Sequence, residues 1–299
     1  MLHFARPAAL LACLALFPLS AVADEVTIRT ARGDVTLMAG PERIAVLDIA
    51  ALDTLTALGV TVQGVPDRLY VDYLDPVAAQ ARPVGTLFEP DLEALAALDP
   101  ELVIAGGRSS TRIEMLTALA PTIDMTIWKD VMAEGRDRIA AYGLLFGRED
   151  RAAAMIAELD AKLAATAAAA QGKGRGLILS VNGPKISAYG RGSRFGWIHD
   201  ALGLPEAREN LDAAVHGDAV SFEFIAETNP DWIFVIDRSA AIGEDSMASD
   251  VLDNPLVART VAAERGQIIY LSSTPAYIAG GGFTSMMTTL GELLTAFSR

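Results

Sequence analysis

The segment FEFIAETNPDWIFVIDRSA, residues 222–240, combines a helical pattern, a proline turn and an apolar run that ends at two charged residues. The run WIFVI predicts a strand covered on both faces, because a strand exposed on one face would alternate apolar and polar residues. Asp237 and Arg238 follow this strand directly. A charge at the end of a buried strand is either a solvated loop residue or a group that points into a cleft.

The same pattern occurs a second time, in LEALAALDPELVIAGGRSS at residues 92–110. The two segments align without a gap, so each feature of one has a counterpart in the other. The matched pairs are Glu93 with Glu223, Pro100 with Pro230, Glu101 with Asp231, and Arg108 with Arg238. The repeat predicts two similar units, each of which presents an arginine at the end of a buried strand.

The bulk composition limits the classes of function. The chain has 299 residues, 52% of them hydrophobic, which is enough for two domains with sizeable cores. The formal net charge is −14, from 24 basic and 38 acidic residues. This balance argues against nucleic-acid binding, which depends on basic patches. It also makes arginines gathered in one cleft more notable, because the field around them has the opposite sign.

The first 23 residues predict a secretory signal peptide, with Arg6 before an apolar run and small residues up to Ala23. We expect cleavage after Ala23 and export to a bacterial periplasm. The run is too short for a permanent membrane span. Cys13, the one cysteine of the chain, lies inside this signal; its context, LLAC, also allows a lipoprotein anchor, which is the lesser alternative. After cleavage the mature chain has no thiol, so disulfides and thiolate sites are excluded.

Strand and helix patterns alternate through most of the chain, which indicates parallel sheets. We predict an α/β fold with two Rossmann-like lobes, joined by a single long rigid helix, and a ligand cleft between the lobes. The boundaries are a β-hairpin extension at 24–40, an N-terminal lobe at 41–147, the inter-lobe helix at 148–174 and a C-terminal lobe at 175–299. The helical pattern at 148–170 would be roughly 34 Å long.

The arginines are the first candidate binding residues. In open parallel sheets, ligands bind beyond the carboxyl ends of the strands, so Arg108 and Arg238 are expected to meet in the cleft from opposite lobes. Arg191 and Arg194 lie in SAYGRGSRFGWIHD, residues 187–200, where a glycine-rich turn and a helix start favour an anion. Arginine suits a delocalised anion because its guanidinium is planar and weakly hydrated. The alternative for each is an arginine solvated in a loop.

Other side chains have weaker signals. His216 and Tyr277 are expected in loops, where either could bind a metal, although a loop tyrosine is usually a packing residue. Glu93 and Glu223 are expected near helix starts. There they either interact with the helix dipole or form a pair of carboxylates, one per lobe, that docks on a two-fold partner. No catalytic motif supports an enzyme, because Ser193 does not lie in a G-x-S-x-G elbow and no phosphate-binding glycine loop is present.

From about Pro41 to its C-terminus, the chain resembles the periplasmic substrate-binding proteins of iron–siderophore and cobalamin ABC importers. Within these it is similar to the subgroup for ferric catecholate siderophores of the enterobactin and petrobactin type. The resemblance is carried by VLDIAALDTLTALGV, LVIAGGRSS, KISAYGRGSRFGWIHDALGL, VHGDAVSFEFIAETNPDWIFVIDRS, LDNPLVART and IIYLSSTPAYIAGGG. It implies a monomer without a permanent cofactor that captures a ferric siderophore and delivers it to a permease dimer.

The resemblance also implies residue roles. Arg108, Arg194 and Arg238 fall on three cleft arginines that hold the anionic iron complex. His216 and Tyr277 fall on residues that complete iron coordination when the siderophore offers only four donor atoms, although SSTPAY departs from the more aromatic family pattern before Tyr277. Glu93 and Glu223 fall on glutamates that dock on the permease. The open alternatives are another iron chelate, haem or cobalamin as cargo, or an exported enzyme or sensor lobe on the same scaffold.

Overall fold

The N-terminal hairpin forms where the sequence predicts it. The computed structural model describes residues 24–213, 217–245 and 248–299, so the predicted signal peptide and Cys13 lie outside the described residues. β1 (Glu25–Thr30) and β2 (Gly33–Met38) pair antiparallel. Gly33 has a φ of +105°, which L side chains rarely adopt. β1 packs against α5 (Val131–Leu145), so the hairpin is attached to the first lobe.

The first lobe is built around a parallel five-stranded sheet with the order β5-β4-β3-β6-β7. Its strands are β3 (Ile44–Val46), β4 (Gly64–Val65), β5 (Arg82–Pro83), β6 (Leu102–Ala105) and β7 (Thr122–Asp124). Its helices are α1 (Ile49–Ala57), α2 (Asp75–Ala78), α3 (Leu92–Leu98) and α4 (Ile113–Thr117). Every residue of the central strands β3 and β6 is buried, as expected for strands covered on both faces.

The second lobe contains the predicted parallel strands, and two further strands of its sheet run antiparallel. The strand order is β10-β9-β8-β11-β12, and the strands are β8 (Gly176–Asn182), β9 (Lys185–Tyr189), β10 (Asp218–Val220), β11 (Trp232–Asp237) and β12 (Ile268–Tyr270). β8, β11 and β12 are parallel, whereas β9 and β10 run antiparallel to their neighbours. Only two residues connect β8 to β9, and so short a connection can join antiparallel strands but not parallel ones.

The internal repeat predicted from the sequence is present in both lobes. α3 and α8 (Phe222–Thr228) each have seven residues and end at a left-handed residue, Asp99 and Asn229 respectively. After a buried proline, each copy places a carboxylate on backbone N–H groups that precede the neighbouring strand. Glu101 accepts from Arg43 N and Glu42 N, and Asp231 accepts from Arg175 N. The two copies therefore share this contact between a carboxylate and the neighbouring strand, as well as their helix and their strand.

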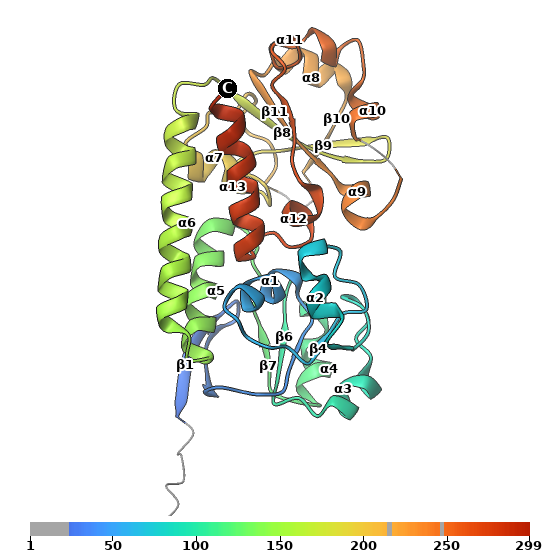
Figure 1. Cartoon of the computed structure of the whole chain (residues 1–299). Helices are drawn as coiled ribbons and strands as arrows, with labels where there is room; N and C mark the ends of the chain where they lie inside the picture. Colours follow the sequence, from blue (N-terminus) through green and yellow to red (C-terminus); the bar gives the residue numbers. More distant parts are fainter. Residues whose placement is uncertain (1–23, 214–216, 246–247) are drawn as a thin grey trace, which may run out of the picture.

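α6 (Glu149–Ala170) carries the chain from the first lobe to the second. It runs along the side of the molecule and packs against α5, α7 (Trp197–Leu202) and α13 (Phe283–Phe297) (Figure 1). The largest hydrophobic cluster contains residues of both lobes and of these helices, so the lobes share one continuous core. No helix in the described part of the chain combines the length and apolar character needed to cross a bilayer.

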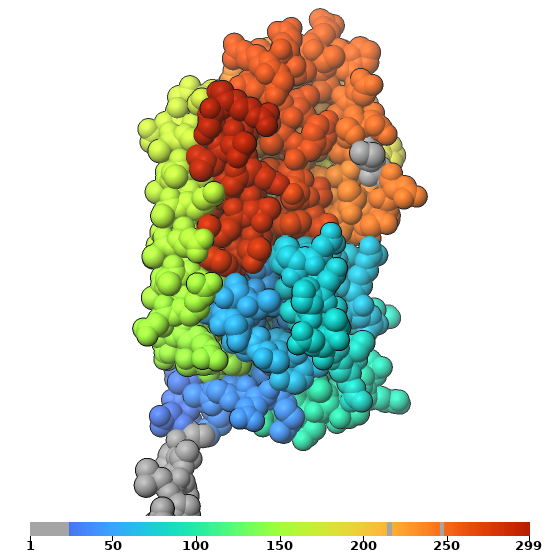
Figure 2. All heavy atoms as spheres, in the orientation of Figure 1, coloured from blue at the N-terminus to red at the C-terminus, as the bar shows by residue number. Residues whose placement is uncertain are grey.

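α13 makes a second connection between the lobes, because it begins against α1. The Asp53 carboxylate of α1 is buried and accepts hydrogen bonds from Thr284 N (2.8 Å) and Ser285 N (2.9 Å) in the first turn of α13. Tyr73 Oη donates to the same carboxylate. A Cβ atom at Gly282 would lie 2.5 Å from Asp53 Oδ2, so this contact requires glycine there. The space-filling view shows the two lobes in direct contact on this face (Figure 2).

The remaining helices of the second lobe are short. They are α9 (Arg238–Ile242), α10 (Ala248–Leu252), α11 (Val261–Glu264) and α12 (Ser273–Tyr277). α9 follows β11 without a loop, and α12 packs against both α9 and α13. This packing places α12 beside the carboxyl end of β11, on the border between the two lobes.

Candidate functional site: an arginine cluster around Tyr277

The charged pair at the end of β11 has two separate tasks. Asp237 is largely buried, and its carboxylate caps α9 by accepting from Ala240 N (2.9 Å) and also accepts from Ala248 N (2.6 Å). Arg238 instead donates from Nε to Tyr277 Oη (2.9 Å) and from Nη1 to Asn182 Oδ1 (2.8 Å). The aspartate is thus structural, and the arginine is the residue of the pair that enters the site.

Arg108 comes from the first lobe, in the 3₁₀ segment Gly107–Arg112 that follows β6. Its Nη2 donates to Tyr277 O (3.3 Å), which belongs to the second lobe. The backbone before Arg108 passes close to Asp48, and a Cβ atom at Gly106 would lie 3.0 Å from Asp48 Cγ. Gly107 has a φ of +51°. The two glycines therefore allow the strand end to pass this carboxylate and present Arg108 at the border of the lobes.

Arg194 lies in the tight turn before α7. Ser193 Oγ donates to Gly190 O (2.5 Å), and a Cβ atom at Gly196 would be 2.1 Å from the same carbonyl oxygen, so the turn requires glycine at 196. Arg194 Nη2 donates to Tyr277 O, the carbonyl that Arg108 also contacts. The Arg194 guanidinium lies 5.1 Å from the centre of the Phe195 ring.

The three arginines form one group around Tyr277, which we call the arginine cluster. The distances from the guanidinium carbon to the centre of the Tyr277 ring are 5.4 Å for Arg108, 4.3 Å for Arg194 and 5.8 Å for Arg238. All three lie within the range of a cation–π contact. Tyr277 was expected in a loop, but it is the last residue of α12. The predicted meeting of arginines from opposite lobes is thus present, with a tyrosine at its centre.

The arginine cluster changes the acidity of Tyr277. Burial raises the pKa of its hydroxyl, but the hydrogen bond from Arg238 and the positive charges of Arg194, Arg238 and Arg108 outweigh burial, so the pKa lies below its ordinary value. Burial also lowers the pKa of Arg194, and the charge of Arg108 lowers it further. The site therefore favours an anionic oxygen at the position of the Tyr277 hydroxyl.

Aromatic side chains form one wall of the site. The Tyr189 and Phe195 rings meet edge to face with centres 4.8 Å apart, and the Phe195 and Tyr277 rings have centres 6.3 Å apart. A small, mainly apolar cavity of about 30 Å³ adjoins them, lined by Arg194, Phe195 and Trp197 among others. Planar cations beside aromatic faces suit a ligand that is itself flat and negatively charged.

Sequence reasoning missed two residues of the site. Asn182 ends β8, and its side-chain oxygen holds the Arg238 guanidinium. The rule that selected Arg108 and Arg238, a polar residue at the carboxyl end of a buried strand, would have found it. Asp48 follows β3 in the same way and caps α1 through Ala51 N (2.8 Å). Burial raises the pKa of Asp48, whereas the charge of nearby Arg108 lowers it.

The other predicted residues lie elsewhere. Arg191 makes ion pairs with Asp200 (2.6 Å) and Glu206 (3.5 Å) rather than joining the arginine cluster. His216 lies outside the described residues. Within the described ranges, no group of three potential metal ligands occurs.

Glu93 and Glu223 are both exposed, each at the second residue of its helix, as the repeat predicted. They lie on α3 and α8, at opposite ends of the molecule (Figure 1). A hydrogen bond with Ser221 lowers the pKa of Glu223.

Comparisons with known proteins agree with this architecture. Residues 44–275 match the periplasmic binding protein family. The petrobactin-binding protein YclQ of Bacillus subtilis is 37% identical over 258 residues, which cover 85% of this chain and 81% of YclQ. Its crystal structure superimposes with a TM-score of 0.87 and 34% identity, covering 92% of this chain and 99% of that one.

Two further solved structures share the fold at 28% identity and a TM-score of 0.83. One is the siderophore-binding protein BauB, bound to two acinetobactin molecules and ferric iron, with 92% of this chain and 99% of that chain covered. The other is the periplasmic catecholate-siderophore binding protein VctP from Vibrio cholerae, with 90% and 99% covered. Because the family's pattern spans residues 44–275 and a relative is 37% identical over 81% of its own length, this chain belongs to the periplasmic binding protein family.

Proposed function

We propose that this protein captures a ferric catecholate siderophore and delivers it to an ABC permease. The observation that carries the proposal is the arginine cluster: Arg108 from one lobe and Arg194 and Arg238 from the other meet on a single phenol ring. A multiply negative chelate of flat rings would be held there by charge and by stacking. Three relatives are named for siderophores, one of them for catecholate siderophores, and they support a cargo of this kind.

The charges are adequate for such a cargo. A ferric tris-catecholate carries about three negative charges, and each guanidinium within contact distance would contribute up to about 4 kcal/mol at an effective dielectric constant near 20, before the cost of desolvation. The hydrogen-bond acceptors that the cluster now uses are neutral oxygens, the Tyr277 carbonyl, the Tyr277 hydroxyl and the Asn182 amide. A catecholate oxygen would be a stronger acceptor than any of them.

Tyr277 has a further role in this proposal. Ferric iron binds phenolate, and the lowered pKa of Tyr277 favours that form. When a siderophore offers only four donor atoms, Tyr277 Oη would leave Arg238 and occupy a free position on the iron. His216 as a second such ligand is a prediction from the sequence alone.

Delivery completes the proposed function. Residues 1–23 would direct export to the periplasm, and the two lobes, 41–147 and 175–299, would enclose the cargo while the helix at 148–174 holds them together. Glu93 and Glu223 would dock on basic sites of a permease dimer, because they are exposed, equivalent and placed one on each lobe. The protein would act as a monomeric carrier without turnover.

The experiment is a titration of the purified mature protein with ferric petrobactin, ferric enterobactin, a ferric trihydroxamate and ferric citrate, followed by tryptophan fluorescence. Trp197 lines the small cavity beside Arg194, so a chelate bound at the cluster would quench it. We expect tight binding of at least one catecholate and weak binding of the hydroxamate, whose complex is close to neutral. Preference for ferric citrate would assign another iron chelate as cargo, and lack of binding to all four would refute the proposal.

A further inference from the structure

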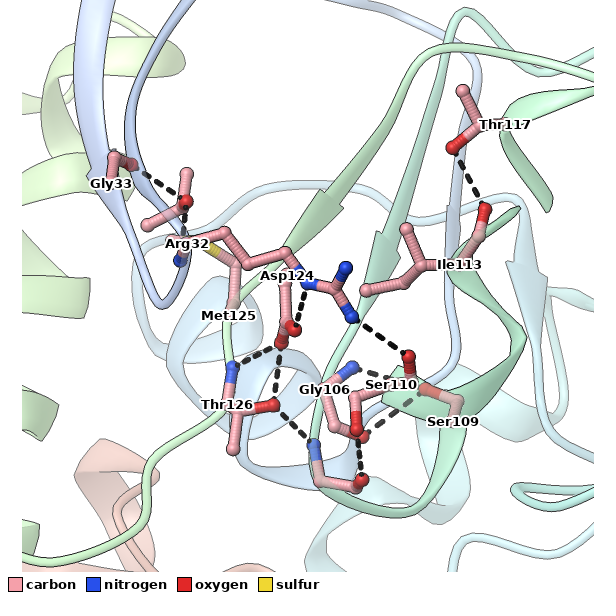
Figure 3. Close-up of polar contacts among 12 residues, drawn as sticks. Arg32, Gly33, Gly106, Ser109, Ser110, Ile113, Thr117, Asp124, Met125 and Thr126 are labelled. Carbon is pink, nitrogen blue, oxygen red and sulfur yellow. Dashed lines mark hydrogen bonds and ion pairs between the residues drawn. The ribbon is translucent and has the colours of Figure 1, made fainter. Parts of the chain in front are cut away.

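A hydrogen-bonded chain connects the N-terminal hairpin to the loop that presents Arg108. Arg32, in the turn between β1 and β2, donates from Nε to Asp124 Oδ2 (2.9 Å) at the end of β7. Its Nη2 also donates to Ser110 O (3.3 Å), within the same 3₁₀ segment as Arg108. Figure 3 shows the Arg32 side chain reaching from the hairpin to both partners.

The chain continues through Thr126 to the residue before Arg108. The Thr126 hydroxyl donates to Asp124 Oδ1 (2.5 Å) and accepts from Gly107 N (2.9 Å). A hydroxyl has one proton to donate, so these two bonds fix its orientation and polarise one another. Gly107 is the residue before Arg108, and its backbone is in the left-handed region. Thr126 therefore fixes the backbone from which the Arg108 side chain leaves.

The hairpin is anchored independently of Arg32. The buried Arg138 side chain donates from Nη1 to Arg29 O (3.2 Å) on β1 and from Nη2 to Thr126 O (3.1 Å). Ala31 N donates to Asp124 O (2.8 Å). Loss of the Arg32 side chain would leave these contacts in place, so its effect on the Arg108 loop can be measured separately from detachment of the hairpin.

We propose that Arg32 is a positioning residue for ligand binding, which acts through Asp124, Thr126 and Ser110 to hold Arg108 at the border of the lobes. The Asp124 carboxylate is 7% exposed while the Arg32 side chain is 58% exposed, so the arginine neutralises a nearly buried charge from the solvent side. This inference rests on the proposed function, since it assigns Arg32 to the same site. It gives the hairpin, which contributes no residue to the arginine cluster, a part in binding.

The test is a double-mutant cycle read by ferric petrobactin affinity, or by ferric enterobactin affinity if that is the cargo bound. Each of Arg32→Gln and Thr126→Val removes two hydrogen bonds of this chain, and we expect each to weaken binding about fivefold. Neither should weaken binding further when Arg108→Ala is already present. Arg43→Gln is the matched control, because Arg43 is also exposed and also binds a carboxylate and a backbone carbonyl, but at the amino ends of β3 and β6 rather than the carboxyl ends.

Thermal unfolding of each variant separates positioning from loss of structure. Arg32→Lys keeps a cation beside Asp124, and we expect it to recover part of the affinity. Wild-type affinity in both Arg32→Gln and Thr126→Val would overturn the inference, as would an equal loss with and without Arg108. If the wild-type protein binds no chelate, the proposed function fails first, and this inference falls with it. If wild type binds and Arg108→Ala weakens binding while the Arg32 and Thr126 variants do not, only the inference fails.

Discussion

Arg108 and Tyr277 belong to different lobes, yet Arg108 Nη2 lies 3.3 Å from the Tyr277 carbonyl oxygen and its guanidinium carbon 5.4 Å from the ring centre. Arg194 contacts the same carbonyl and Arg238 the hydroxyl. These contacts join the two lobes at the half-buried Tyr277. A ligand that binds the arginine cluster must compete with Tyr277 for these donors, so ligand affinity and the position of Tyr277 are coupled.

The acidity of Tyr277 gives the first prediction. Its pKa lies below the ordinary value of 10.0, so its phenolate should form at a lower pH than in the unfolded chain, and Tyr277→Phe should remove near-ultraviolet phenolate absorbance that appears below pH 10. Because the folded pKa is the lower one, the resulting stability is complete above the unfolded pKa and lost as pH falls through the folded pKa. The free energy of unfolding of wild type relative to Tyr277→Phe should therefore increase as pH rises through the folded pKa and level off above the unfolded pKa.

Tyr270 is the control for that titration. Burial raises its pKa, and Asp250 and Asp253 raise it further, so Tyr270→Phe should remove absorbance only above pH 10. Equal loss of absorbance below pH 10 in both variants would mean that the arginines do not stabilise the Tyr277 phenolate.

The second prediction concerns the contact between α1 and α13. Asp53→Ala leaves the N–H groups of Thr284 and Ser285 and the Tyr73 hydroxyl without their acceptor. We expect the free energy of unfolding to fall by about 3 kcal/mol, measured by urea denaturation, because one of these donors is buried and the other two are partly buried. Asp91→Ala removes an exposed helix cap and should cost about 1 kcal/mol. If Asp53→Ala costs no more than Asp91→Ala, the contact does not hold the lobes together.

The third prediction concerns delivery. The double variant Glu93→Arg with Glu223→Arg reverses an exposed charge on each lobe without touching the arginine cluster. We expect unchanged affinity for the ferric chelate and loss of iron uptake by cells that depend on this protein. Glu89→Arg with Glu227→Arg, at exposed positions nearby, is the matched control and should retain uptake. Weakened chelate binding in the first variant would show that the glutamates are structural.

The sequence predicted the parts of the fold that depend on local pattern. The hairpin and both copies of helix, turn and strand are present. The antiparallel β9 and β10 were not predicted, because β9 follows β8 after a turn of only two residues and β10 has only three residues. The capping of α13 by Asp53 joins residues more than 200 positions apart, and no local pattern contains that contact.

The candidate site was predicted in part for a similar reason. Strand ends identify Arg108 and Arg238, because topology alone places them at one edge of each sheet. The sequence of the turn at 190–196 did not distinguish Arg191 from Arg194 as the residue that binds an anion. Asp200 and Glu206 hold Arg191, whereas Arg194 is left to reach Tyr277. Which arginine enters the site depends on these tertiary partners, and the central place of Tyr277 depends on the packing of α12 against α9.

The most direct test of the account is the affinity of Arg108→Ala, Arg194→Ala and Arg238→Ala for the ferric catecholate that wild type binds, measured by tryptophan quenching. Each variant loses a charged donor, so we predict that each binds about tenfold or more weakly. Arg136→Ala, which breaks an exposed ion pair with Asp160, should bind as wild type does. Wild-type affinity in all three cluster variants would contradict the central claim that guanidinium groups from both lobes hold the iron chelate.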